Sequence, residues 1–127
     1  MRISTRAMIG VWMLVLMMAM TGCSGGGAGA WDPAEVEVEL TTDPAAVQAG
    51  EEITLIARFI GVPNKPATDM RFDIPHNNRS YLTKGHDAGD GSYTLLFTFP
   101  EPGTYDIYFH YYVDGEHITK IKKLEVS

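Results

Sequence analysis

Four histidines and one cysteine are the side chains of this sequence best suited to chemistry. The histidines, His76, His86, His110 and His117, all lie in the second half of the chain, and Cys23 lies near its start. Neutral imidazole binds Cu(II), Zn(II) or Ni(II) well. A metal site needs three or four ligands that converge on one point. The elements around the histidines therefore decide whether they form a site.

The cysteine follows a segment that is typical of export. Arg2 and Arg6 precede the apolar run "MIGVWMLVLMMAM" (residues 8–20), and small residues follow it. A positive start, a short apolar stretch and small residues before a cleavage point describe a secretory signal. The run is also shorter than the roughly 20 residues that a helix needs to cross a bilayer. We therefore expect residues 1–22 to be a signal peptide.

The motif "MTGC" resembles the lipobox of bacterial lipoproteins. Thr21 and Gly22 fit the pattern, and Met20 stands where leucine is usual. The match predicts that Cys23 receives a diacylglycerol group and an N-acyl chain such as palmitate, which together hold a protein stably on a membrane. The expected location is the extracytoplasmic face of the cell membrane. The alternative is an ordinary signal peptide with an incidental cysteine.

The charge balance restricts the partners. The full chain has 10 basic and 16 acidic residues and a net charge of −6. Loss of residues 1–22 removes two arginines and no acidic residue, so the remaining chain carries a net charge of −8. Nucleic acids and anionic bilayers both attract lysine and arginine. We therefore expect no nucleic-acid partner, and membrane attachment through lipid alone.

Beyond a glycine-rich tether (residues 23–33), apolar and polar residues alternate with period two, which predicts strands. The predicted strands are "AEVEVEL", "EEITLIARFI", "DMRFDIPH", "RSYLTK", "SYTLLFTFP", "TYDIYFHYYV" and "EHITKIKKLEV". About seven strands in residues 34–127 indicate an all-β domain, an immunoglobulin-like β-sandwich. A small barrel is the alternative. Gly103–Tyr105 predicts a tyrosine corner at the start of one strand.

The last two strands carry two of the histidines. Asp114–Gly115 is a strong signal for a two-residue hairpin turn. That turn would place His110 and His117 on one face as diagonal neighbours, with Cβ atoms about 7 Å apart. It would also put Lys120 and Lys122 on the apolar face. A slip of one residue would separate the histidines, and the sequence leaves both registers open.

From about residue 35 onward, the chain resembles the YtkA-like family of exported bacterial domains, which overlaps with FixH-like sequences. The resemblance is carried by "VQAGEEITLIARF" and "KGHDAGDGSYTLLFTFPEPGTYDIYFHYYVDGEH". The second segment contains a histidine (His86), an Asp-Gly-x-Tyr motif, a Pro-Gly-x-Tyr motif and a His-x6-His pair (His110 and His117). The resemblance implies an immunoglobulin-like sandwich outside the cytoplasmic membrane.

The same resemblance implies a metal site. Its ligands would be His86, His110 and His117, with His76 as a candidate fourth. FixH-type proteins are associated with cation pumps and oxidase maturation, so copper is the implied metal and zinc the alternative. FixH proteins carry a transmembrane helix where this chain has a lipobox, so their role does not transfer directly.

The tyrosines support an alternative hypothesis, a surface for contact with another protein. Tyr108 and Tyr112 share the polar face of their strand with His110, and an exposed aromatic patch of this kind suits contact with another envelope protein. The sequence shows no nucleophile elbow, no zinc-protease helix motif and no phosphate loop. We therefore expect a binding protein rather than an enzyme, and the metal and protein-contact alternatives stay open.

Overall fold

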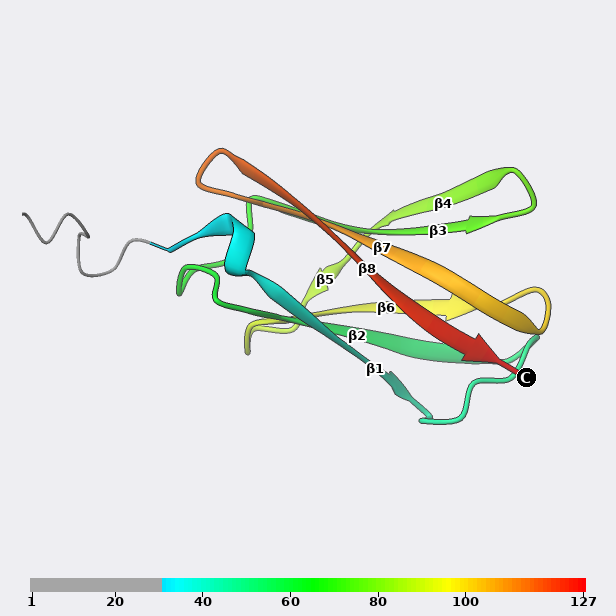
Figure 1. Cartoon of the computed structure of the whole chain (residues 1–127). Helices are drawn as coiled ribbons and strands as arrows, with labels where there is room; N and C mark the ends of the chain where they lie inside the picture. Colours follow the sequence, from blue (N-terminus) through cyan, green and yellow to red (C-terminus); the bar gives the residue numbers. More distant parts are fainter. Residues whose placement is uncertain (1–30) are drawn as a thin grey trace, which may run out of the picture. The chain divides into compact units, whose positions relative to one another are not determined.

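Two four-stranded antiparallel sheets pack face to face in the computed structural model, which describes residues 31–127 (Figure 1). The predicted signal peptide, Cys23 and most of the tether lie outside the described residues. The elements are η2 (Pro33–Glu35), β1 (Glu37–Asp43), β2 (Glu52–Ile60), β3 (Asp69–His76), β4 (Arg79–Lys84), β5 (His86–Asp87), β6 (Ser92–Thr98), β7 (Gly103–Val113) and β8 (Glu116–Val126). The predicted all-β, immunoglobulin-like sandwich is confirmed, with the two-residue β5 as an additional strand.

The folded unit begins at Trp31, slightly before the predicted boundary at residue 34. Trp31 packs against the core, and Asp32 caps the short η2 helix by accepting a hydrogen bond from the Ala34 amide at 2.9 Å. In residues 31–127, no helix is long and apolar enough to cross a membrane.

The strand order is β1-β2-β6-β5 in the first sheet and β4-β3-β7-β8 in the second. β1 and β8 run along one edge of the sandwich, where they contact each other. At the other edge the chain leaves the second sheet after β4 and enters the first sheet as β5. Gly85 lies between these strands, is buried, and donates its amide hydrogen to the Met70 carbonyl at 2.8 Å.

The alternating pattern explains the core between the sheets. The predicted inward residues of β2 and β7 are all buried: Ile53, Leu55, Ala57, Phe59, Tyr105, Ile107, Phe109, Tyr111 and Val113. Aromatic rings join the two sheets, with the Phe59 and Tyr111 ring centroids 4.4 Å apart. The predicted tyrosine corner is also confirmed, because the Tyr105 hydroxyl donates to the Glu101 carbonyl at 2.7 Å.

Gly85 is required by close packing at the crossing between the sheets. A Cβ atom there would lie 2.6 Å from the Met70 sulfur and 3.1 Å from Phe72 Cε2. We expect Gly85→Ala to lower the free energy of unfolding by about 1–3 kcal/mol, the usual cost of overpacking a core. Urea denaturation would measure the loss. If the Met70 contact causes it, adding Met70→Val should make the double variant more stable than the sum of the single effects predicts; simple additivity would contradict this explanation.

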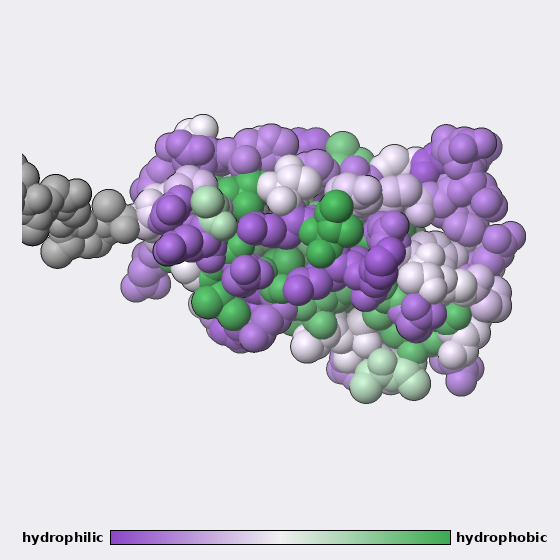
Figure 2. All heavy atoms as spheres, viewed as in Figure 1, coloured by the Kyte–Doolittle hydropathy of each residue, from purple (hydrophilic) through white to green (hydrophobic). Residues whose placement is uncertain are grey.

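The two lysines that the turn register places on the inner face lie at an edge. Lys120 pairs with Phe109 and Lys122 with Ile107, and both lysines belong to β8, the last strand of its sheet. Lys120 is half-buried and Lys122 is exposed. At an edge a lysine can lay its methylene chain on apolar surface while its ammonium group stays in water. In Figure 2, hydrophilic and hydrophobic side chains are interspersed on the visible face of the molecule.

Candidate functional site

The hairpin between β7 and β8 has the two-residue turn. Val113 pairs with Glu116, and Asp114 and Gly115 both have positive φ angles, 52° and 77°. Two successive positive φ angles match the twist of a tight hairpin, and Asp-Gly is a favoured pair for them. Lys65 pairs with the Asp114 carboxylate and fixes the turn to the β2–β3 loop. The first of the two registers that the sequence left open is therefore the one formed.

This register brings His110 and His117 together on the outer face of the second sheet. His110 pairs with Thr119 and His117 with Tyr112, so the histidines are diagonal neighbours. The distance from His110 Nδ1 to His117 Nε2 is 3.1 Å. His117 is exposed, and the His110 side chain is 21% exposed to solvent. Both nitrogens thus come from strands that are paired along their length.

Asp73 lies behind His110. Its Oδ2 is 3.3 Å from His110 Nε2, and the Ser80 hydroxyl bonds to its other oxygen. A carboxylate accepts hydrogen bonds only, so the His110 proton belongs on Nε2 and the Nδ1 lone pair faces His117. A carboxylate that fixes the tautomer in this way is the usual outer support of a metal-binding histidine.

Two neighbours orient His117. The Tyr112 ring stacks on the imidazole, with ring centroids 4.2 Å apart and an interplanar angle of 13°. The Thr119 hydroxyl lies 3.4 Å from His117 Nε2.

Without a metal, the short contact between the histidines is an N–H···N hydrogen bond from His117 to the free Nδ1 of His110. For both nitrogens to bind a metal ion, the His117 proton would move from Nε2 to Nδ1 of the same ring, which frees the Nε2 lone pair.

The spacing of the two nitrogens suits a metal ion. Two nitrogens bound to one tetrahedral Zn(II) ion at about 2.0–2.1 Å lie about 3.3 Å apart, and a square arrangement brings them to about 2.9 Å. The observed 3.1 Å lies between these values. However, no group of three or more His, Cys, Asp or Glu side chains in residues 31–127 is placed to hold a metal. The pair supplies two ligands.

The expected cluster of three histidines is not formed. His86, in β5, pairs with Thr94, which lies on the outer face of the first sheet opposite Ile56. The crossing at Gly85 therefore puts His86 on the far surface of the sandwich from His110 and His117. This is a correction to the ligand set that the family resemblance implied.

His76 is also separate from the pair. It ends β3, and its ring stacks on Tyr105 with ring centroids 5.4 Å apart. His76 Nε2 lies 3.3 Å from a Glu101 carboxylate oxygen. These contacts belong to the end of the sandwich that holds the tyrosine corner. His76 therefore does not serve as a fourth ligand of the pair.

The tyrosines lie on the same outer face as the pair. Tyr108 and Tyr112 are half-buried there, and Tyr108 pairs with Asp73 on one side and Ile121 on the other. Leu82, beyond Asp73 on β4, and Ile121 are 53% and 51% exposed. This face therefore carries aliphatic and aromatic groups around the tyrosines.

Asp73, Leu82 and Ile121 were not among the site residues predicted from the sequence. The alternation of apolar and polar residues shows which face of a strand a residue lies on, but it does not show which strands pair with each other. The pairing of β3 with β7 brings Asp73 behind His110.

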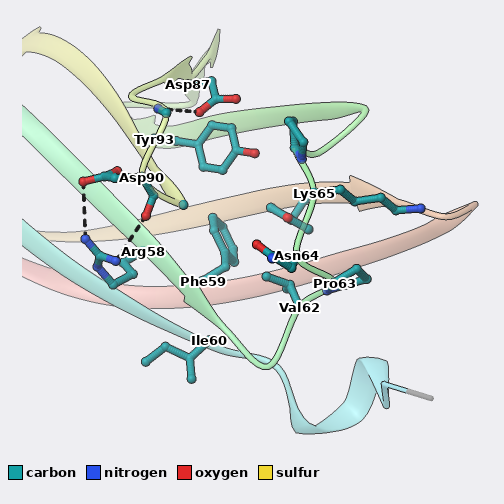
Figure 3. A pocket seen from close by; sticks show the side chains of 14 residues that line it. Arg58, Phe59, Ile60, Val62, Pro63, Asn64, Lys65, Asp87, Asp90 and Tyr93 are labelled. Carbon is teal, nitrogen blue, oxygen red and sulfur yellow. Dashed lines mark hydrogen bonds and ion pairs between the residues drawn. The ribbon is translucent and has the colours of Figure 1, made fainter. Parts of the chain in front are cut away.

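A shallow cleft of about 470 Å³ lies between the β2–β3 loop and the β5–β6 turn (Figure 3). Phe59, Tyr93 and Tyr111 line it, and burial raises the pKa of Tyr111, which keeps that hydroxyl neutral. At the rim, Arg58 pairs with Asp90 at 3.5 Å, as Figure 3 shows. Hydrogen bonds from Ser92 lower the pKa of Asp90. Arg58 and Asp90 are thus paired, Asp87 accepts a hydrogen bond from the Gly89 amide at 2.8 Å, and within residues 31–127 no group of three metal-binding side chains converges here.

Comparison with models of protein families gave no match, and comparison with curated proteins gave none. Among solved structures, an engineered protein matches 76% of this chain over 21% of its own length, with a TM-score of 0.57 and 13% identity. A cycloalternan-degrading enzyme from Trueperella pyogenes matches 65% of this chain over 11% of its own, with a TM-score of 0.52 and 18% identity. The PKD domain of the human VPS10 domain-containing receptor SorCS2 gives a TM-score of 0.47 at 14% identity, with 72% of each chain covered.

This chain spans about a fifth of the engineered protein and about a tenth of the enzyme. At these identities the similarity concerns the fold alone.

Proposed function

We propose that this chain is a lipid-anchored, extracytoplasmic lipoprotein that binds a divalent transition metal, copper or zinc, through His110 and His117. The observation that carries the metal proposal is the 3.1 Å separation of two imidazole nitrogens backed by Asp73. The anchor rests on Cys23 and the signal-like segment before it. The YtkA-like resemblance supports the extracytoplasmic location and includes His110 and His117 in its pattern.

The residues have distinct roles in this proposal. His110 Nδ1 and His117 Nε2 bind the ion, Asp73 holds His110 in the required tautomer, and Tyr112 holds the plane of the His117 ring. Paired strands keep these groups in place, so little ordering accompanies binding. A two-nitrogen site leaves positions on the ion open to outside ligands. Such a site suits binding and transfer of an ion rather than a reaction on a substrate.

Site-resolved NMR would test the metal proposal. Zinc would be titrated into residues 24–127, which contain the whole two-sheet core, while imidazole ¹H–¹⁵N correlations are recorded. The four histidines act as internal controls. We expect the His110 and His117 rings to respond together and the His76 and His86 rings to stay unchanged. No response below millimolar zinc, or a response centred on His86, would contradict the proposal.

Asp73 provides a test of the outer support. Asp73→Asn keeps the size of the side chain but removes the charge that stabilises the Nε2-protonated tautomer of His110. We expect a loss of about 10- to 100-fold in zinc affinity, the usual effect of changing such a partner. A competition titration with a coloured chelator would measure it. Asp106→Asn, on the same face and paired with Lys123 at 2.8 Å, is the matched control and should leave affinity unchanged; equal losses in both variants would indicate a general charge effect.

The second candidate is a protein-contact module that uses the face around Tyr108 and Tyr112. The exposure of Leu82 and Ile121 on that face favours it. This candidate predicts no selective response of His110 and His117 to zinc. The NMR titration therefore separates the two functions.

A further inference from the structure

We infer that one metal ion joins two copies of this chain, each of which contributes His110 and His117. This inference rests on the proposed function and names the partner that completes the site. It starts from the ligand count: His110 and His117 supply two nitrogens, and no third metal-binding side chain converges with them in residues 31–127. Zinc sites in proteins usually have four ligands, or three with a water.

The pair lies where a second copy can reach it. Its two strands pair from Gly103 to Val126, and the histidines stand on the outer face of this hairpin rather than in a cleft. Neither His110 nor His117 lines any of three clefts in the described part of the chain. A two-fold axis through the ion would bring the same two nitrogens from the second copy. In such a symmetric contact each chain uses the same patch.

The charged groups near the pair do not oppose this contact. Asp73 is engaged by His110 and Ser80, and the Arg71 guanidinium pairs with Asp69 at 2.8 Å. Arg71 and Asp69 are therefore paired within each chain, and the Asp73 carboxylate lies on the Nε2 side of the His110 ring, whereas Nδ1 faces His117. The uncharged groups Tyr112 and Thr119 lie directly beside the histidines.

Apolar groups extend the same patch. Ile121 and Tyr108 are paired residues on this face, and Ile121 is 51% exposed. Their burial between two copies would add to the metal bonds. Without residues 1–22 each chain has a net charge of −8, so two copies repel each other, and a divalent cation bound between them reduces that repulsion. The structure thus points to a dimer that forms only with the metal.

Sedimentation velocity on residues 24–127, with zinc added stepwise after chelator treatment, would test this. We expect a monomer without zinc and a dimer that is complete at one zinc per two chains. His117→Ala should stay monomeric, and His86→Ala, which changes a histidine on the opposite surface, should dimerise like the unchanged chain.

Zinc bound at one ion per chain, with the chain still monomeric, would overturn the dimer and leave the proposed function standing. Absence of zinc binding in the NMR titration would overturn both.

A second pair of variants tests the face itself. Ile121→Glu should raise the dissociation constant of the zinc-bound dimer by about tenfold or more, because it places two like charges in an apolar contact. Leu96→Glu is the matched control, since Leu96 is 63% exposed on the outer face of the first sheet. The NMR response of His110 to zinc should persist in both. Equal dimerisation of the two variants would overturn the face-to-face arrangement.

Discussion

Replacing His117 with alanine should weaken zinc binding by roughly 100-fold or more. The substitution removes one of the two nitrogens that lie 3.1 Å apart and leaves His110 as a single ligand. Loss of an outer support usually costs about 10- to 100-fold in affinity, so loss of a direct ligand should cost at least as much. His117 is exposed, so its removal should not disturb the core. Competition against a coloured zinc chelator would give both affinities under identical conditions.

His86→Ala is the control for this experiment. It removes one imidazole from the same chain, but from the outer face of the first sheet. Its zinc affinity should equal that of the unchanged chain. If His86→Ala lost as much affinity as His117→Ala, the two-histidine site would be wrong and a cluster that includes His86 would have to be reconsidered.

Phe109→Ala should produce the largest loss of stability, about 3–5 kcal/mol in the free energy of unfolding. The Phe109 ring is fully buried and lies between the sheets, with its centroid 5.6 Å from that of Phe72 and 6.3 Å from that of Phe59. Truncation would remove this packing and leave a cavity among aromatic rings that cannot easily collapse. Chemical denaturation followed by tryptophan fluorescence would measure the loss.

Two comparisons make the stability test specific. Phe109→Leu keeps most of the buried volume and should lose clearly less stability than the alanine variant. Leu96→Ala truncates a side chain that is 63% exposed and should change stability by less than about 0.5 kcal/mol. A Phe109→Ala loss as small as that of Leu96→Ala would show that the packing between the sheets contributes little.

Much of the fold was predictable because its signals are local. Alternation along the chain gave the strands and their buried faces, as the fully buried Phe109 and Ile107 illustrate. Asp114–Gly115 favoured the two-residue turn on its own chemistry. This turn places Lys120 and Lys122 on the apolar face, which argued against it. The structure accommodates both lysines because β8 is an edge strand, and the sequence does not show which strands lie at an edge.

The site was only partly predictable because its remaining parts depend on non-local pairing. The contact between His110 and His117 follows from one hairpin and was within reach. The position of Asp73 behind His110 depends on the pairing of β3 with β7, which are separated by three other strands along the chain. The exclusion of His86 depends on a single crossing at Gly85. Neither the pairing of β3 with β7 nor the crossing at Gly85 changes the alternation of apolar and polar residues along the chain.

The lysines of β8 also bear on how large an assembly this protein can build. An exposed strand edge is a template on which further chains can add without limit, and charged side chains that point inward from the edge prevent this. Lys120 and Lys122 occupy those positions on β8. The two lysines therefore disfavour growth along the β8 edge, and a symmetric contact through the flat outer face closes on itself after two copies. Association at a metal ion through this face thus ends at a pair of chains and does not extend along β8.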